Sequence, residues 1–372
     1  MKKILLFLLV MAAMLAAITW LRYGGGDPYA DLSTPPRYTD DDLDVVLAYP
    51  EPVGNVAVSP DGRLFFTVHP ESRPRGNRLL EFVEGASEPY PDVRSQLDLF
   101  DTVLGLTVDT RNRLWTIDHG NHGLRDARIV AIDLERNAVI RDQVLPDDIA
   151  PAGSYLQDLR VTPDGRTVII ADASFWRKSP ALIVYDVESG QARRVLEGHD
   201  SVSAENFVIS ANGQALRYLA GLVTFKGGVD GLAVGPEWIY FGAINGSSLF
   251  RVAVADVRNE ALSSGELAAR VERYSPKPLS DGMEVDEDGN VYVTDVEHNS
   301  VYIVGLDRKP RTLLRSPRIR WPDAVANGPD GQLFVADSAL PELILQPREH
   351  IAAQGPYRIF RLRTGDATTA DH

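Results

Sequence analysis

The chain has 372 residues, 44% of them hydrophobic, a formal net charge of −14 and no cysteine. Without cysteine there are no disulfide bonds, thiolate nucleophiles or cysteine metal sites. The acidic balance argues against nucleic acid and anionic lipid surfaces as partners of the folded part.

The chain begins with Lys2 and Lys3, followed by an apolar run that extends to Leu21. This pattern is typical of a secretory signal peptide or a signal anchor, and the run is almost long enough to span a bilayer. Residues 1–23 are therefore expected to direct export to a periplasmic or extracellular location. An uncleaved leader would hold the protein in the cytoplasmic membrane, with residues 24–40 as a tether.

One pattern recurs six times within residues 41–364. Each copy has alternating apolar residues, a turn, which contains Asp-Gly in four copies, and a β-branched or aromatic run, as in a β-hairpin. The copies begin at Gly54, Leu104, Gln157, Asp230, Asp281 and Asp323. Their spacing is close to the roughly 40 to 50 residues of a four-stranded blade, except for a longer third interval. The sequence predicts an all-β protein with the fold of a six-bladed β-propeller.

Two more strand patterns, at residues 41–50 and 357–363, lie outside the six copies. Because an open ring would expose sheet edges, the N-terminal strand is expected to close the last blade. The long third interval includes residues 198–228, which are expected to form an extra hairpin or a lid over one mouth. Residues 365–372 are predicted to be disordered.

The first strand of each blade lines the channel of a propeller, so residues at one phase of successive copies form a ring. Asp230, Asp281 and Asp323 share the first place in their copies and are expected to meet at one mouth. Gathered carboxylates repel each other unless a cation neutralises them, and oxygen ligands favour Ca²⁺ or another divalent cation. Alternatively, these aspartates accept backbone N–H bonds and are structural.

Aspartates that end the second strands return to the same mouth, and a structural role is favoured for them. They are Asp118, Asp172, Asp295 and Asp337.

Other polar and aromatic residues are expected near the same mouth. Gln157, Asp158 and Asn55 are candidate ligand-binding residues, and Trp321 is a candidate wall of the pocket, although aromatic residues also pack between blades. His119 lies in a loop with a second histidine and could shuttle protons or bind a metal, or it could belong to a polar loop. The chain has no G-x-S-x-G elbow, phosphate loop or HExxH motif, so no nucleotide cofactor is expected.

Several segments together resemble the Yellow and major royal jelly protein family, in a bacterial-type version. They are LWTIDHG, RIVAIDLERNAVIRDQVLP, LQDLRV, SDGMEVDEDGNVYVTDVEHNSV and WPDAVANGPDGQLFVADS. The resemblance extends from about Pro52 to Arg363 and implies a secreted six-bladed propeller whose central cavity binds small molecules. In that family some members look like dopachrome-converting enzymes, some bind biogenic amines, and others are nutritional or structural.

A more distant likeness is to the gluconolactonase and senescence-marker family, which are calcium- or zinc-dependent lactonases on the same fold. Asp281 matches the aspartate ligand of that family. Gln157 stands in the place of an asparagine ligand, and Gly54-Asn55 stands where a glutamate ligand is expected. Two of the three ligands are therefore altered.

Three functions remain open. The first is binding of a small polar or cationic molecule in the mouth, with or without a divalent cation, where Asp281 or His119 acts as the catalytic base of a tautomerase-type proton transfer. The second is lactone hydrolysis by a metal-bound water. The third is a non-catalytic, membrane-tethered scaffold for envelope proteins. The chain is expected to be a monomer with a small-molecule ligand and no nucleic acid partner.

Overall fold

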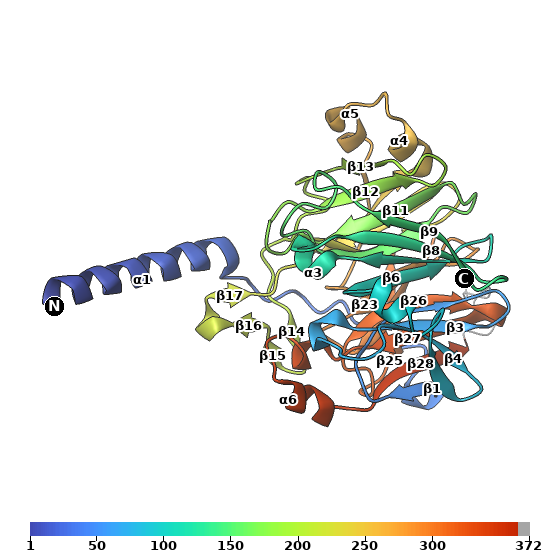
Figure 1. The fold of residues 1–372 in the computed structure, drawn as a ribbon, viewed down its shortest axis with the longest axis horizontal. Coiled ribbons are helices and arrows are strands. Elements are labelled where there is room, and N and C mark those ends of the chain that lie inside the picture. Colours follow the sequence, from blue (N-terminus) through green and yellow to red (C-terminus); the bar gives the residue numbers. More distant parts are fainter. Residues whose placement is uncertain (364–372) are drawn as a thin grey trace.

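The computed structural model describes residues 1–363, so the predicted disordered tail lies outside the described residues. A long helix, α1 (Lys2–Tyr23), projects from one face of a ring of six four-stranded antiparallel sheets (Figure 1). Its mean hydropathy of 2.7 and its 22 residues would allow it to cross a membrane, and a signal sequence would have the same properties. The six sheets confirm the predicted six-bladed β-propeller.

The first three blades follow the chain from the channel outward. They are β2 (Val53–Val58), β3 (Leu64–Val68), β4 (Leu79–Val83) and β5 (Ala86–Pro89); β6 (Val103–Val108), β7 (Arg113–Asp118), β8 (Arg128–Asp133) and β9 (Ala138–Val144); β10 (Leu156–Val161), β11 (Thr167–Asp172), β12 (Ala181–Asp186) and β13 (Ala192–Val195). Short helices α2 (Ser95–Asp98) and α3 (Gly120–Gly123) lie in their connections.

Blades four and five have the same order, and blade six combines both ends of the chain. They are β18 (Val229–Val234), β19 (Trp238–Ala243), β20 (Ser248–Ala253) and β21 (Glu272–Pro276); β22 (Met283–Val285), β23 (Val291–Asp295), β24 (Ser300–Val304) and β25 (Pro310–Arg315); β26 (Pro322–Gly328), β27 (Gln332–Asp337), β28 (Tyr357–Arg363) and β1 (Leu43–Tyr49). Helices α4 (Val254–Arg258), α5 (Ser264–Ala268) and α6 (Arg348–Ala353) lie in loops.

The N-terminal strand closes the ring as expected. β1 pairs antiparallel with β28, and the register runs from Leu43 opposite Leu362 to Tyr49 opposite Tyr357. The backbone groups of β28 are therefore paired on both sides, which removes the edge that an open ring would leave. The two ends of the folded part are held in one sheet.

The inner strands approach each other so closely that glycine is required after two of the three channel aspartates, Asp230 and Asp281, whereas Asp323 is followed by Ala324. A Cβ atom on Gly231 would lie 2.4 Å from the carbonyl oxygen of Asp281, and one on Gly282 would lie 2.6 Å from that of Asp323. Both obstacles are backbone atoms of the neighbouring blade and cannot rotate away. The pairs Asp230-Gly231 and Asp281-Gly282 therefore each combine a channel-facing carboxyl group with the contact that packs adjacent blades.

Gly282→Ala is expected to lower the free energy of unfolding by about 1–3 kcal/mol, because the added methyl group overpacks the contact between blades five and six. The control is Gly265→Ala in helix α5, where a Cβ meets no atom within 4 Å and alanine favours the helix. Chemical denaturation of both variants measures the difference. Equal stability of the two variants would contradict this account of the Asp-Gly pair.

The long third interval forms two small hairpins between blades three and four. They comprise β14 (Ser210–Ala211) with β15 (Gln214–Ala215), and β16 (Arg217–Tyr218) with β17 (Val223–Thr224). They lie on the face of the propeller from which α1 projects (Figure 1). This face is called the mouth face below.

Residues 24–40, the predicted tether, have backbone and side-chain contacts with the propeller. Asp27 forms a bridge with Phe207, and Tyr38 forms a bridge with Leu314. The carboxylate of Asp40 lies 2.7 Å from Nε of Arg318. These two bridges and the ion pair hold the segment against the propeller as a strap.

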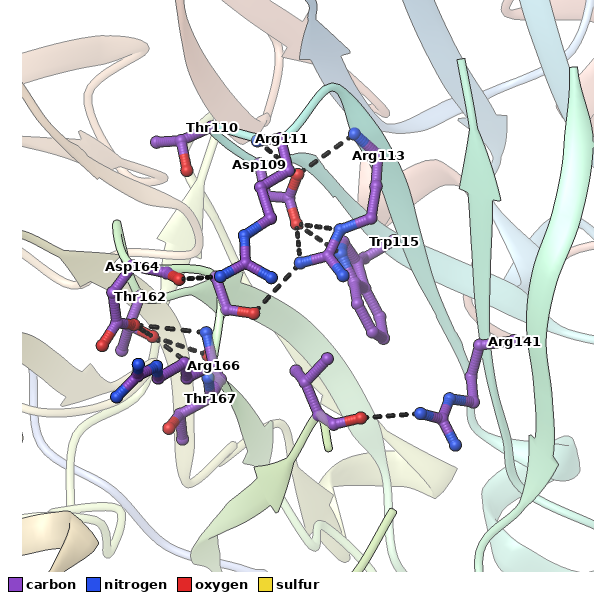
Figure 2. Close-up of polar contacts among 12 residues, drawn as sticks. Asp109, Thr110, Arg111, Arg113, Trp115, Arg141, Thr162, Asp164, Arg166 and Thr167 are labelled. Carbon is purple, nitrogen blue, oxygen red and sulfur yellow. Dashed lines mark hydrogen bonds and ion pairs between the residues drawn. The ribbon is translucent and has the colours of Figure 1, made fainter. Parts of the chain in front are cut away.

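The opposite face is held by polar contacts between blades two and three (Figure 2). The Asp109 carboxylate accepts hydrogen bonds from Nε of Arg113 at 2.7 Å and from Nε1 of Trp115 at 2.9 Å. Nη2 of Arg113 also donates to the carbonyl oxygen of Gly165, 3.0 Å away in the hairpin turn of blade three. A buried carboxylate with these partners is satisfied and therefore structural.

Candidate functional site

The three channel aspartates lie together at the mouth-face end of the channel. Asp230, Asp281 and Asp323 come from the inner edges of blades four, five and six and have exposed fractions of 3%, 5% and 7%. The carboxyl groups of Asp230 and Asp281 share a hydrogen bond. The repeat phase therefore identified residues that are neighbours in space.

Burial raises the pKa of each of these carboxyl groups. The pKa of Asp281 is raised to about 6. The pKa values of Asp230 and Asp323 are raised well above the ordinary value, first by burial and then by the charge of Asp281. Neighbouring buried carboxyls cannot all ionise, so the cluster retains protons near neutral pH.

Three further side chains surround this carboxyl cluster. Nε1 of Trp321 donates a hydrogen bond of 2.6 Å to Oδ2 of Asp281. Nε2 of His69 lies 3.6 Å from Oδ2 of Asp323. Lys277 is fully buried, and burial lowers its pKa to about 7. The charge of this lysine lowers the pKa of Asp281.

The donor arrangement does not fit a resident divalent cation. Oδ2 of Asp281 accepts from Trp321, and the carboxyl groups of Asp230 and Asp281 are hydrogen-bonded to each other, whereas Oδ2 of Asp230 and Oδ2 of Asp323 have no hydrogen-bond partner among residues 1–363. Within residues 1–363, no group of three or more His, Asp or Glu side chains is arranged so that it could hold a metal ion. Oxygen ligands that are already hydrogen-bonded must give up those bonds before they can coordinate Ca²⁺.

Purified protein is accordingly expected to contain less than stoichiometric calcium, and calcium added after chelation should leave the melting temperature unchanged. Elemental analysis and thermal unfolding measure the two results. Stoichiometric calcium that is lost in Asp281→Asn would restore the metal site predicted from the repeat.

Asp158 and Asn55 lie in the channel but are occupied by structural partners. Oδ1 of Asp158 accepts hydrogen bonds from Nη1 of Arg160 at 2.7 Å and from the backbone N–H of Leu159 at 2.9 Å. The amide of Asn55 lies 3.5 Å from the same oxygen. Nη2 of Arg160 donates to the carbonyl oxygen of Met283 across the channel at 2.9 Å. Arg160 therefore forms a buried ion pair within blade three and also links that blade to blade five.

The aspartates that end the second strands satisfy local donors. Asp118 accepts from the backbone N–H groups of Asp101 at 2.6 Å and of Thr102 at 2.8 Å. The other three pair with side chains at 2.8 to 2.9 Å: Asp172 with Arg194, Asp295 with His298, and Asp337 with Arg320. These contacts agree with the structural role favoured for them.

A pocket of about 130 Å³ opens on the mouth face. Its walls are apolar and aromatic, and they come from the loops of blades three and six and from hairpin β16–β17. The wall residues are Phe175, Trp176, Tyr218, Leu219, Val223, Phe225, Leu340, Ile344 and Leu345. Its polar lining consists of Glu71, His122, Tyr155 and Gln157. Of the predicted ligand-binding residues, Gln157 lines this pocket.

Glu71 and His122 are hydrogen-bonded to each other in the pocket. Oε1 of Glu71 lies 2.9 Å from Nε2 of His122 and 3.4 Å from the hydroxyl of Tyr155. Burial alone would raise the pKa of Glu71, but the hydrogen bond and charge of His122 and the nearby His69 lower this pKa to about 2. The carboxylate therefore stays ionised. In the neutral tautomer of His122 in which Nε2 donates to Glu71, Nδ1 is an acceptor, and it has no hydrogen-bond partner among residues 1–363.

His119, the predicted catalytic histidine, lies behind His122. Nδ1 of His119 accepts from the backbone N–H of His122 at 2.9 Å, and its ring is 1% exposed. Burial lowers its pKa to about 3, so His119 is neutral. The loop then turns through left-handed Asn121 and His122, with φ values of 49° and 59°. The second histidine of the loop, and not the first, lines the pocket.

Trp321 stands behind the pocket wall. It is fully buried, and its ring centroid lies 6.4 Å from that of Phe225, which lines the pocket. The sequence analysis did not single out Glu71 or Tyr155. Directly after its second strand, blade one has His69 where blade two has His119, and Glu71 lies two residues further along the same loop, so the phase of the repeat indicated the loop but not Glu71 itself. Tyr155 lies before the inner strand β10 and before Gln157, the first residue of its repeat copy, so it was not among the positions compared between copies.

The sequence model of the major royal jelly proteins matches residues 102–313, more than half of the chain. The chain belongs to the major royal jelly protein family. The match extends across blades two to five and includes His122, Tyr155 and Gln157, while Glu71 and Trp321 lie outside it. The predicted family resemblance is confirmed. A comparison with curated proteins finds no match.

Solved structures with the same fold include lactonases and a calcium-binding protein. A gluconolactonase from Xanthomonas campestris is 16% identical, with 91% of this chain and 98% of that chain covered and a TM-score of 0.54. The calcium-binding protein regucalcin from Agrobacterium tumefaciens is 15% identical, with 88% and 95% covered and a TM-score of 0.57. A luciferin-regenerating enzyme is 12% identical, with 87% and 95% covered and a TM-score of 0.56. At these identities the likeness of this royal jelly family protein to them is one of fold.

Proposed function

We propose that this protein is exported and binds a small molecule with an aromatic or aliphatic body and a cationic head in the mouth-face pocket. The observation that carries the proposal is the combination of aromatic walls with one carboxylate, Glu71, whose pKa is lowered to about 2. A pocket that is mostly apolar with a few convergent polar groups is the usual form of a small-molecule site. The ionised carboxylate selects a positive charge.

The aromatic walls favour the same ligand class. The rings of Phe175 and Phe225 stack with centroids 5.8 Å apart, and Trp176 meets Phe175 edge to face at 4.8 Å. Aromatic faces attract organic cations as well as apolar rings. An aromatic amine satisfies both requirements, since its ring can lie against Phe175 and Phe225 while its ammonium group faces Glu71.

The proposed chemistry is a proton transfer within the bound ligand. Nδ1 of His122 is an unpartnered acceptor, and Glu71 on the other ring nitrogen stabilises the imidazolium that forms when Nδ1 takes a proton. The proton is then returned to another atom of the same ligand, which gives a tautomer. His122 replaces the predicted His119 in this proposal. Asp281 belongs to the buried carboxyl cluster, does not line the pocket, and takes no step in this proposed transfer.

Glu71→Gln is expected to weaken binding of an aromatic amine such as tyramine about tenfold to a hundredfold, because a hydrogen bond to a charged group is lost. Binding of para-ethylphenol, which has the same ring without the amine, should change little. Isothermal titration calorimetry measures both ligands. Glu88→Gln removes the same charge on an exposed outer strand and should affect neither. An equal loss for amine and phenol would contradict the role of Glu71.

Lactone hydrolysis is the second candidate, favoured by the fold shared with the Xanthomonas gluconolactonase. Because the carboxyl cluster does not fit a resident metal, His122 would activate the water directly. Turnover of sugar lactones by chelator-treated protein, abolished in His122→Gln, would support this candidate over amine binding. A non-catalytic scaffold for envelope proteins stays a prediction.

A further inference from the structure

The C-terminal end of α1 is fixed to the rim of the pocket. The hydroxyl of Tyr23 donates to the carbonyl oxygen of Trp176 at 2.9 Å, and Nη2 of Arg22 donates to that of Arg177 at 3.1 Å. The ring of Tyr23 stacks with that of Phe175 at a centroid distance of 6.1 Å. Both Phe175 and Trp176 line the pocket. The apolar helix therefore leaves the propeller beside the pocket mouth, and it projects away from that face (Figure 1).

The chain following the helix is also held at this place. Nζ of Lys226 donates to the carbonyl oxygen of Gly24 at 2.6 Å, and Oγ1 of Thr224 donates to that of Gly25 at 2.7 Å. Gly26 accepts from Nη2 of Arg217 at 3.2 Å. The three glycines have no side chains, so the strap can lie against hairpin β16–β17. These contacts fix the position of the mouth face relative to the end of α1.

Basic residues surround the end of α1 although the whole chain carries a net charge of −14. This basic collar consists of Arg22, Arg177, Lys178, Arg217 and Lys226. Burial and the charges of Lys226 and Arg22 lower the pKa of Lys178 to about 8, which shows how closely these cations gather. Glu197 pairs with Arg177 at 2.5 Å and offsets one of the charges. The net charge of the whole chain therefore does not describe the local charge of the mouth face.

Large apolar side chains protrude at the same rim. Trp176, Leu219 and Leu345 line the pocket and are 48%, 62% and 69% exposed. Leu219 and Leu345 have left-handed backbone, with φ values of 50° and 59°, a conformation that costs a bulky residue energy. Exposed apolar side chains beside aromatic and basic residues are typical of a surface that meets a bilayer.

We propose that the mouth face lies on an anionic lipid bilayer into which α1 inserts, so that the pocket opens at the membrane interface. The basic collar would meet the lipid phosphates, and Tyr23 and Trp176 would lie at the level of the head groups. A ligand then reaches the pocket from the interface, which favours amphiphilic molecules over highly polar ones. This placement is independent of the ligand proposed above, and it differs from the expectation that anionic lipid surfaces are not partners of the folded part.

The absence of cysteine allows a direct test with the full-length protein. Single-cysteine variants Leu219→Cys and Leu345→Cys are labelled with an environment-sensitive fluorophore and reconstituted in vesicles that contain a lipid-borne quencher. The matched control is Leu306→Cys, which is 73% exposed and lies in the β24–β25 loop at the opposite face. Quenching at the two rim positions should exceed quenching at the control position several-fold. Equal quenching at all three positions would overturn the proposal.

The lipid composition tests the role of the collar. Rim quenching should be greater in phosphatidylcholine vesicles with added phosphatidylglycerol than in phosphatidylcholine alone, and Arg217→Gln should reduce the difference while Lys309→Gln, on the opposite face, should not. Rim quenching that is the same with and without phosphatidylglycerol would overturn the proposal of an anionic lipid partner. Cleavage of α1 with release of the mature protein from membranes, found by mass spectrometry, would overturn the placement. Amine binding in detergent solution is measured separately, so its failure would leave this test unaffected.

Discussion

Trp321→Ala is expected to lower the free energy of unfolding by about 3–5 kcal/mol, the range found when a buried tryptophan is truncated. Trp321 is fully buried in the core cluster that also contains Phe225 and Leu340, so truncation leaves a cavity behind the pocket wall. It also removes the donor to Oδ2 of Asp281. Chemical denaturation measures the loss. A loss below that of Gly282→Ala would contradict the central position assigned to this side chain.

Trp321→Phe separates the packing of the ring from its hydrogen bond. Phenylalanine retains most of the apolar volume but has no N–H group, so Asp281 loses a donor that favours its ionised form. The loss of stability is expected to be about 1–3 kcal/mol and greater above pH 6, where Asp281 ionises, than below it. Trp115→Phe is the control, because it removes an indole donor from Asp109, a carboxylate that also pairs with Arg113 (Figure 2). Its loss should show no such change near pH 6.

The carboxyl cluster is expected to destabilise the folded protein as the pH rises. The folded-state pKa of Asp281 is raised to about 6, and those of Asp230 and Asp323 are raised further above the ordinary value. Groups with raised pKa values stabilise the fold fully below about pH 4, where the unfolded chain is also protonated, and lose that contribution as the pH rises through the folded-state values. The slope is at most about 1.4 kcal/mol per pH unit for each proton.

Asp230→Asn isolates this contribution. Asparagine resembles the protonated aspartic acid in shape and can donate to Asp281, so the variant should match the parent protein near pH 5 and be more stable near pH 8. The other titratable and charged groups that interact with the cluster remain in both proteins; they include Asp158, Lys277, His69, Arg160, Asp337 and Tyr155. The difference between the two melting curves therefore reports Asp230. A variant that is less stable than the parent near pH 8 would contradict the proton-sharing cluster.

The buried histidines have the opposite effect on stability: they destabilise the folded protein as the pH falls. Burial lowers the pKa of His69 to about 4 and that of His119 to about 3. Their contribution is complete above the unfolded value of about 6.5 and is lost as the pH falls toward the folded-state values. The parent protein is therefore expected to be most stable between these two effects. Only the comparison with Asp230→Asn separates them.

The sequence by itself determined the ring of six blades, its closure and the meeting of three aspartates. The fold repeats, so one hairpin pattern with a fixed phase specifies each inner strand. Glycine follows Asp230 and Asp281 because Gly231 and Gly282 contact the backbone of the next blade. Family membership also followed from these segments. Strand periodicity and turn chemistry are local properties, which a sequence displays directly.

Only the tertiary structure decided which polar side chains are free. Asp158 is occupied by Arg160 and Asp281 by Trp321, whereas His122 retains an unpartnered nitrogen beside Glu71. The pocket wall comes from hairpin β16–β17 and from blades three and six, segments far apart in the chain. A hydrogen bond or an apolar contact between such segments depends on how loops cross in space, and no periodic pattern in the sequence records that crossing.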